Sequence, residues 1–324
     1  AKSRMELFCY GRTADKRSYR VDVSRTGGAG GNQLTAASSE GRQVIIYRVY
    51  VPDRGRDLTG GVGLPSVELV LASGKRLSGV AACKAMAAST RLPSSKAYPA
   101  GAYKALRDQK GKPAGWPARN PPRFSRTFNV TSQIMCAYRS VCEAHPLLAP
   151  GQYSNLDNAY ASALVSRSFS QGPVLVLTGT MPEVAATWPA AKTMPTTAQL
   201  RYWSICQNES MATTRVASCL PDYQVPLSAQ RHFVIVSSTP QDRPRNARVA
   251  CKVAWLPWPT RGDGAGHRND GLLILRNMLP AEGFGGALQS VSAPGEEAAV
   301  MGSALPTGRY TTKAAFERLG CPAR

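Results

Sequence analysis

Histidine is scarce in this chain of 324 residues, and the motifs of several common enzyme classes are missing from it. The three histidines, His145, His232 and His267, lie far apart, and no two cysteines have the C-x-x-C spacing of many zinc sites. No G-x-S-x-G nucleophile elbow, phosphate-binding loop or dinucleotide-binding fingerprint occurs. We therefore expect no cofactor and no metal, and the sequence leaves open whether the protein is an enzyme.

Long apolar runs are also absent. No stretch approaches the roughly 20 apolar residues that cross a bilayer, although the hydrophobic content of 43% is ordinary for a globular protein. The length exceeds the usual size of one hydrophobic core, so we expect one large domain or two moderate ones. The chain begins at Ala1 rather than at methionine, which we interpret as a mature exported protein without its signal peptide, or as a trimmed chain.

Cysteine, in contrast, is well represented. Eight cysteines, an even number, fit export to an oxidising compartment, with buried thiols or a metal site as the alternatives. The pairs closest in sequence are Cys136–Cys142 and Cys206–Cys219. We predict a disulfide in each pair, closing a short loop that contributes roughly 2–3 kcal/mol in the chain-entropy model. Cys321 is predicted to pin a C-terminal helix to the body of the fold.

Positive charge is in excess and is unevenly distributed. The formal net charge is +20, and residues 1–150 carry 24 of the 40 basic residues but 9 of the 20 acidic ones. Such a field attracts polyanions and acidic envelope surfaces. Nucleic acid is not the expected partner, because an exported disulfide protein meets acidic glycans, lipid head groups or acidic proteins first. A solubilising surface, or a bias from a GC-rich genome, is the alternative interpretation.

Strand signals dominate the sequence. Between Gln199 and Asp222, aromatic and branched residues alternate with polar ones over residues 200–207, and a return strand at 215–219 ends in a second cysteine. Further strands are predicted at 44–51, 67–71, 76–80, 160–167, 174–177, 231–236, 249–255 and 272–276, and alternation resumes over 124–138.

Helix is predicted only near the C-terminus. One short helix is expected to begin at residues 294–297. A second is expected to be capped by Thr311 or Thr312 and to bury Ala315, Phe316 and Leu319. The fold class that follows is mainly β, with one or two antiparallel β-sandwich (jelly-roll-like) domains and short C-terminal helices.

Composition suggests three regions. Residues 1–93 are predicted to form a basic N-terminal β domain, and residues 94–126, rich in Pro, Lys and Arg, a linker or a long loop. Residues 127–324 are predicted to form a C-terminal β-sandwich domain. A short similarity between 44–83 and 160–206 leaves open a tandem pair of related sandwiches.

Several blocks in the second half resemble those of a known group of proteins. They are the stretches 154–160 (SNLDNAY), 173–177 (PVLVL), 201–204 (RYWS), 255–258 (WLPW) and 275–280 (LRNMLP). The order resembles uncharacterised exported bacterial β-sandwich proteins of a domain-of-unknown-function family, with an Asn-x-Asp-x-x-Tyr and R-Y-W-S pattern over about residues 150–310. The resemblance implies a secreted β-sandwich and carries over no catalytic residue.

One candidate ligand-binding group lies near predicted strand ends. A carboxylate, phenols and a guanidinium there would suit proton transfer or the binding of an anionic sugar. The alternative is an Asx turn at Asn155 and Asp157 together with a structural Arg–Asp pair. The residues of this group are Asn155, Asp157, Tyr160, Arg201 and Tyr202.

Aromatic residues provide a second candidate. Trp203, Trp255 and Trp258, with Tyr153 and Tyr202, could form a stacking surface for sugars or a partner protein, or could belong to the core.

The Gly-rich loop Arg261 to Asp270 is the third candidate. It contains His267 and an Arg-Gly-Asp tripeptide, and could hold a base, a cation site or an adhesion motif, or be a mobile turn.

The function that fits these patterns is an exported, disulfide-stabilised binding protein. It would act at the cell envelope or outside the cell, secreted, periplasmic or at the cell surface, on an acidic polymer or a partner protein. A polymer-acting hydrolase or lyase on the same scaffold, or a structural subunit of an extracellular assembly, are the alternatives. Ligand identity, the full disulfide pattern and the oligomeric state lie beyond the sequence.

Overall fold

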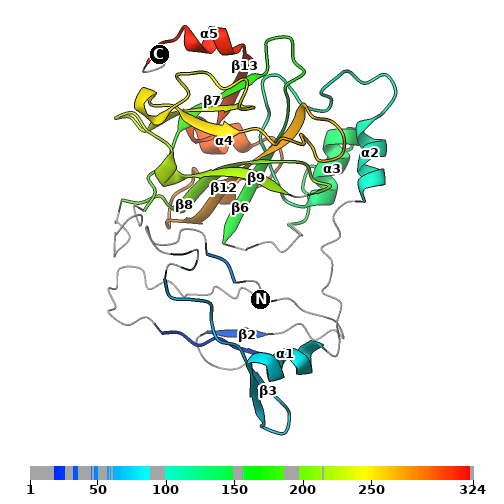
Figure 1. Cartoon of the computed structure of the whole chain (residues 1–324), viewed down its shortest axis with the longest axis vertical. Helices are drawn as coiled ribbons and strands as arrows, with labels where there is room; N and C mark the ends of the chain where they lie inside the picture. Colours follow the sequence, from blue (N-terminus) through cyan, green and yellow to red (C-terminus); the bar gives the residue numbers. More distant parts are fainter. Residues whose placement is uncertain are drawn as a thin grey trace. The chain divides into compact units, whose positions relative to one another are not determined.

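The computed structural model describes residues 18–25, 32–35, 45, 47–49, 57, 59, 61–87, 99–148, 155, 157–185, 197–213 and 215–321 (Figure 1). The chain divides into two units, Ala1–Ser95 with Ala186–Met194, and Lys96–Ala185 with Pro195–Arg324. Strands in several mostly antiparallel sheets make up most of the regular structure. The mainly β prediction is therefore confirmed, whereas the sandwich or jelly-roll topology stays a prediction.

In the first unit, the described residues form two small sheets and a helix. Strands β1 (Asp22–Ser24) and β2 (Gln33–Thr35) pair in parallel. Strands β3 (Glu68–Val70) and β4 (Arg76–Ser78) form an antiparallel hairpin, followed directly by helix α1 (Gly79–Ala87).

Two strand predictions fall in this unit. The strand predicted at 76–80 ends at Ser78, because Gly79 has a φ of +50° and an Ala-rich, helix-forming stretch follows it. Of the strand predicted at 44–51, residues 45 and 47–49 are described and lie in no strand, and the rest falls outside the described residues.

The second unit contains two larger sheets. The first has five antiparallel strands in the order β5 (Ser125–Arg126), β6 (Asn158–Ser166), β12 (Asp270–Pro280), β8 (Leu200–Asn208) and β9 (Val216–Pro221). The second has four strands in the order β11 (Ala254–Pro257), β10 (His232–Ser238), β7 (Val174–Thr180) and β13 (Thr307–Thr311). Strands β10 and β11 pair in parallel and the remaining pairs are antiparallel.

Both sheets contribute to one hydrophobic core. On the five-stranded sheet, small residues of β6 face large residues of β12, since Ala163 lies opposite Leu273 and Ala161 opposite Leu275. Trp203 of β8 is fully buried, and its ring lies 5.6 Å from that of Phe233 in β10. Side chains of β7, β11 and β13 complete the same cluster. Pairing small with large side chains fills the space between sheets without voids.

Helices α2 (Ala100–Arg107) and α3 (Val130–Arg139) pack on the opposite face of the five-stranded sheet (Figure 1). Tyr103, Leu106, Ile134 and Tyr138 are buried there against Leu272 of β12. The segment predicted as a linker or long loop (94–126) thus contains a helix and several buried side chains, among them Tyr103, Leu106 and Phe124.

Helix α3 also differs from the prediction, because it occupies much of the stretch 124–138 that was predicted to have alternating apolar residues. Asn129 caps it, because its side-chain oxygen accepts the Ser132 N–H at 2.6 Å. Ile134 and Tyr138, four residues apart, then form one buried face. Helix is therefore not confined to the C-terminus.

The C-terminal part follows the prediction more closely. Helix α4 (Glu297–Met301) and helix α5 (Lys313–Glu317) are both short, and Thr312 caps α5 by accepting the Ala315 N–H at 3.1 Å. The strand predicted at 249–255 is a 3₁₀ turn, Val249–Cys251, followed by β11. Strand β13 was not predicted. Three other 3₁₀ turns are Asp222–Gln224, Leu288–Ser290 and Gly302–Ala304.

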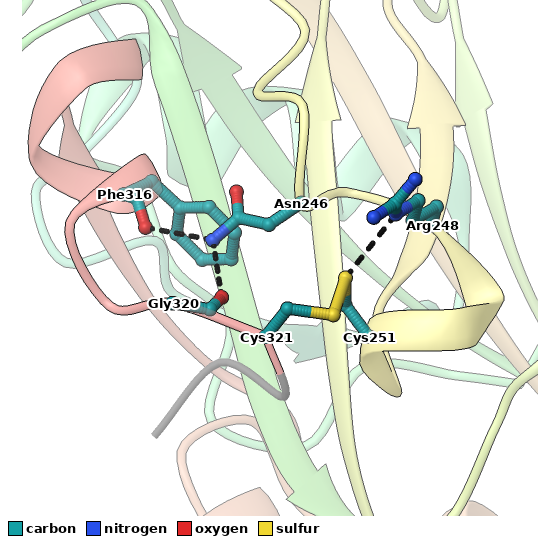
Figure 2. The surroundings of a disulfide bond; sticks show 6 residues. All are labelled: Asn246, Arg248, Cys251, Phe316, Gly320 and Cys321. Atoms are coloured by element: carbon teal, nitrogen blue, oxygen red, sulfur yellow. Dashed lines mark hydrogen bonds between the residues drawn. A yellow bond between two sulfur atoms is a disulfide. The ribbon is translucent and has the colours of Figure 1, made fainter.

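Three disulfides staple the second unit. The predicted pairs Cys136–Cys142 and Cys206–Cys219 are confirmed, and a third joins Cys251 to Cys321. Figure 2 shows the third disulfide beside the end of α5, where the Asn246 amide donates to the carbonyls of Phe316 (3.0 Å) and Gly320 (2.8 Å). Cys321 therefore pins this helix, as the sequence predicts. Cys83 on α1 is exposed and unpaired in the described part of the chain.

None of the helices within the described ranges has the length and apolar character needed to span a membrane.

Candidate functional site around His267

The loop between β11 and β12 is folded around the buried carboxylate of Asp263. Gly262 and Gly264 have φ values of +61° and +73°, a conformation that favours glycine. A Cβ added to Gly262 would lie 2.2 Å from the carbonyl oxygen of His267, so this position has no room for a side chain. The curled loop lets Asp263 Oδ1 accept the N–H groups of Ala265 (2.8 Å) and His267 (3.0 Å).

The ring of His267 lies between two carboxylates. Its Nδ1 is 2.6 Å from Asp263 Oδ2, and its Nε2 is 2.6 Å from Asp108 Oδ1. Asp108 belongs to a different element, because it is the C-cap of α2. A carboxylate accepts hydrogen bonds, and a neutral imidazole has a single N–H to donate. A neutral ring can therefore donate to only one of the two carboxylates.

A second polar contact ties α2 to the start of β12, the central strand of the five-stranded sheet. Asp270, the first residue of β12, accepts from Arg107 Nε at 2.6 Å and from Ser166 Oγ at 2.8 Å. The side chains of Arg107 and Asp270 are 10% and 11% exposed. Ser166 and Asp270 are partners in the β6–β12 register, so the strand pairing itself sets this contact. A buried charge in such a place needs a partner of opposite sign, which Arg107 provides.

Two tyrosines line the inner side of this group. Burial raises the pKa of Tyr103 far above its usual value, and the neighbouring Tyr138 and Asp263 raise it further. Burial also raises the pKa of Tyr138 to about 12. Both phenols therefore stay neutral over the physiological range. At Asp108 the hydrogen bond from the Lys104 ammonium is the largest cause that lowers the pKa of the carboxyl group; burial opposes it, and His267 lowers the pKa further.

This geometry decides between the interpretations of the loop. Asp263 is 1% exposed, so its carboxylate is not available for the adhesion motif that the Arg-Gly-Asp tripeptide suggests. The loop is also held by several hydrogen bonds rather than being an open turn. The base and cation interpretations remain. Asp263, His267 and Asp270 each offer a ligand atom, and these atoms lie within 4.8 Å of one another.

The group predicted around Asp157 and Tyr160 lies elsewhere. Tyr160 is opposite Arg276 in the sheet, with the guanidinium 5.6 Å from its ring. Ser166 lies six positions beyond Tyr160 along β6, which corresponds to about 20 Å along a strand. Tyr202 faces the same side of the sheet from β8, opposite Met278. Tyr160 and Tyr202 are thus brought to one face of the sheet, far from His267.

Of the alternative interpretation for this group, the Asx turn at Asn155 and Asp157 is present in the structure. Asn155 Oδ1 accepts the Asp157 N–H at 3.0 Å, which is the Asx turn. Arg201 lies close enough to Asp222 to oppose the rise that burial causes in the pKa of that carboxyl group. Tyr153 lies outside the described residues.

The tryptophans are mostly part of the core. Trp203 and Trp258 are 0% and 2% exposed, so neither is available for ligand stacking. Trp255 is half-buried, and its indole N–H donates to Ser238 Oγ at 3.1 Å while the Arg243 guanidinium lies 4.2 Å from its ring. The core alternative therefore holds for the first two tryptophans.

Sequence reasoning found His267 but missed its partners. The Asp263-x₃-His267 spacing inside a Gly-rich loop was the available signal for Asp263 and for Asp270 three residues further on. Arg107 and Asp108 had no such signal, because they come from a segment whose composition resembles that of a linker.

No known protein family and no curated protein matches this chain. Among solved structures, a crystal structure of an uncharacterised protein from Burkholderia cenocepacia is similar over 52% of this chain, with 15% sequence identity and a TM-score of 0.29. The similarity covers 33% of that protein, so the chain spans about a third of its length, and a similarity at this level supports no functional argument.

Proposed function

We propose that this chain is an exported, disulfide-stabilised binding protein that attaches to an acidic polymer at the cell envelope or outside the cell. The observation that carries the proposal is the run of basic side chains in residues 99–148 of the second unit. That stretch contains eight basic residues but only two acidic ones, Asp108 and Glu143. Repeated cations that are not neutralised by neighbours attract a repeating anion.

The exposed members of this run are the part that a polymer would contact. Lys110, Lys112, Arg119, Arg123 and Arg139 are exposed, and none forms an ion pair with another residue in the described ranges. We call these five residues the basic run. Arg107 is excluded because it is buried with Asp270, and Lys104 because it bonds to Asp108.

The disulfides support the location. Three disulfides within one unit are typical of proteins that fold in an oxidising compartment and are rare in reducing ones. We further infer a β-sandwich scaffold for this unit, since the five-stranded and four-stranded sheets share one core.

The test is binding of the full chain to acidic polymers of defined chemistry at several salt concentrations. Heparin serves as a sulfated glycan and polyglutamate as a carboxylated polymer. We expect binding to both, with an affinity that falls at least tenfold between 0.05 and 0.5 M salt as screening shortens the range of the charges.

Two matched triple variants separate the basic run from net charge. Replacing Lys110, Arg119 and Arg123 with Gln should weaken binding several-fold more than replacing three exposed basic residues elsewhere in the unit, Lys252, Arg309 and Arg318. Equal losses would show that net charge alone acts. Binding that resists salt would instead favour a partner protein or an enzyme site.

A further inference from the structure

We propose that Asp263, His267 and Asp270 bind a divalent cation of the zinc type, and that Asp108 orients the imidazole ring from outside the coordination sphere. This site does not depend on the proposed polymer binding. Its residues come from the β11–β12 loop and from β12, with the outer partner on α2, all within the second unit.

The donor set determines the kind of cation. One ring nitrogen and two carboxylates lie with their ligand atoms within 4.8 Å of one another, and Asp263 and Asp270 are buried. Imidazole and carboxylate ligands together suit Zn²⁺ and related transition cations, with an open position left for water or a ligand. Calcium and magnesium prefer ligand sets made of oxygen. The mixed set therefore favours the zinc type.

The charges around the ring leave one carboxylate without compensation. Asp270 is paired with Arg107, and Asp108 with Lys104. Asp263 is 1% exposed, and among the described residues it has no ion pair with a lysine or arginine. A buried carboxylate needs a compensating charge. A cation bound between Asp263 and His267 would supply that charge.

The position of Asp108 supports a metal cation bound at Nδ1 of His267. Metal-binding histidines commonly donate their other N–H to a carboxylate, which fixes the tautomer and the ring orientation. Asp108 Oδ1, 2.6 Å from Nε2, is placed for this role and comes from a separate helix. With the proton on Nε2, the lone pair of Nδ1 points toward Asp263, where a cation would be shared between them.

Zinc binding to the full chain, stripped with a chelator and titrated with ZnCl₂ at constant pH, tests the proposal. One Zn²⁺ per chain is expected, and excess Mg²⁺ should not displace it. His267→Gln should abolish this binding, and Asp108→Asn should weaken it by about 10–100-fold, the usual effect of losing an outer partner. His232→Gln is the matched control, because His232 is an exposed histidine of β10 whose ring contacts Thr180 Oγ1.

X-ray absorption at the zinc edge gives a reading on the unaltered chain, even where a variant fails to fold. One imidazole with oxygen ligands is the expected shell. A sulfur ligand would point to Cys83, or to Cys9, which lies outside the described residues. That result, an all-oxygen shell or the absence of stoichiometric binding would overturn the proposal.

Discussion

Buried charges are the distinctive feature of the second unit at the scale of single residues. Arg107 and Asp270 form a pair that is about one tenth exposed, yet both come from elements whose neighbours are largely apolar. Forming such a pair returns little net stability, because both groups lose their hydration. Removing one partner is different, since the other charge is then left buried alone.

The variant Arg107→Ala is therefore expected to lower the free energy of unfolding by about 3–5 kcal/mol. Urea denaturation followed by fluorescence would measure the change. Arg245→Ala is the matched control, since Arg245 also pairs with a carboxylate, Glu317, but its side chain is 88% exposed. There a loss below about 1 kcal/mol is expected. Similar losses in both variants would mean that Asp270 is accessible to water.

Asp108 provides a prediction for pH dependence. Lys104, and then His267, hold the pKa of this carboxyl group below its usual value. A group whose pKa is lowered in the folded state adds stability above its unfolded pKa, and this contribution is lost as the pH falls through the lowered folded value. The stability difference between the chain and Asp108→Asn should thus be present near neutral pH and disappear in acid.

A carbon-detected NMR titration of the Asp108 carboxyl group measures the same effect directly. Lys104→Gln should move its midpoint upward, toward the usual value for aspartate, because Lys104 is the largest cause of the lowered pKa. Lys110→Gln removes an exposed charge nearby in sequence and should have a much smaller effect. Equal shifts in both variants would argue that general charge, rather than the hydrogen bond, sets the pKa.

At the scale of elements, caps decide where helices form. Helix α3 begins at Asn129, whose Oδ1 accepts the Ser132 N–H at 2.6 Å while its Nδ2 donates to the Leu147 carbonyl at 3.1 Å. Asn129→Ala should lower the free energy of unfolding by about 1 kcal/mol, within the range of N-cap losses. Asn129→Ser, which keeps an accepting oxygen, should recover most of it in the same denaturation measurement. A loss of equal size in Asn129→Ser would assign the effect to the contact with Leu147 instead.

Strand β8 and helices α2 and α3 show which sequence signals could predict an element and which could not. Strand β8 was predictable because aromatic and branched residues recur with a period of two, with Trp203 and Ile205 on one face. The pairing of Cys206 with Cys219 follows from the hairpin. Helix α3 was not predictable, since apolar residues at 128, 130 and 134 fit two periods equally well and the cap decides between them. Helix α2 was hidden because its buried side chains, Tyr103 and Leu106, are few among lysines and glycines.

The candidate site was predictable only in part for a related reason. His267 and its loop are local in sequence, so a Gly-rich stretch with a histidine draws attention to them. Asp108 reaches the ring from 159 residues away, and Arg107 reaches Asp270 from 163 residues away. Such contacts depend on α2 lying over the end of β12, which follows from tertiary packing and not from any local pattern.

At the scale of the whole molecule, the disulfides differ in how much of the chain they constrain. Cys136–Cys142 spans 6 residues, whereas Cys251–Cys321 spans 70 and encloses β11, β12, β13 and both C-terminal helices. Because a disulfide stabilises mainly by limiting the unfolded chain, the longer loop should contribute more, about 4 kcal/mol against about 2 kcal/mol for the shorter one.

Replacing both cysteines of each disulfide with alanine tests which disulfide contributes more to stability. The variant without Cys251 and Cys321 should lose roughly twice the free energy of unfolding lost by the variant without Cys136 and Cys142. Its α5 should also show faster amide hydrogen exchange, because the Asn246 bonds to Phe316 and Gly320 would then hold the helix without covalent support. Equal losses would indicate that the unfolded chain keeps residues 251 and 321 close together. In that case the disulfide would act on the folded state, by fixing the end of α5 against the four-stranded sheet.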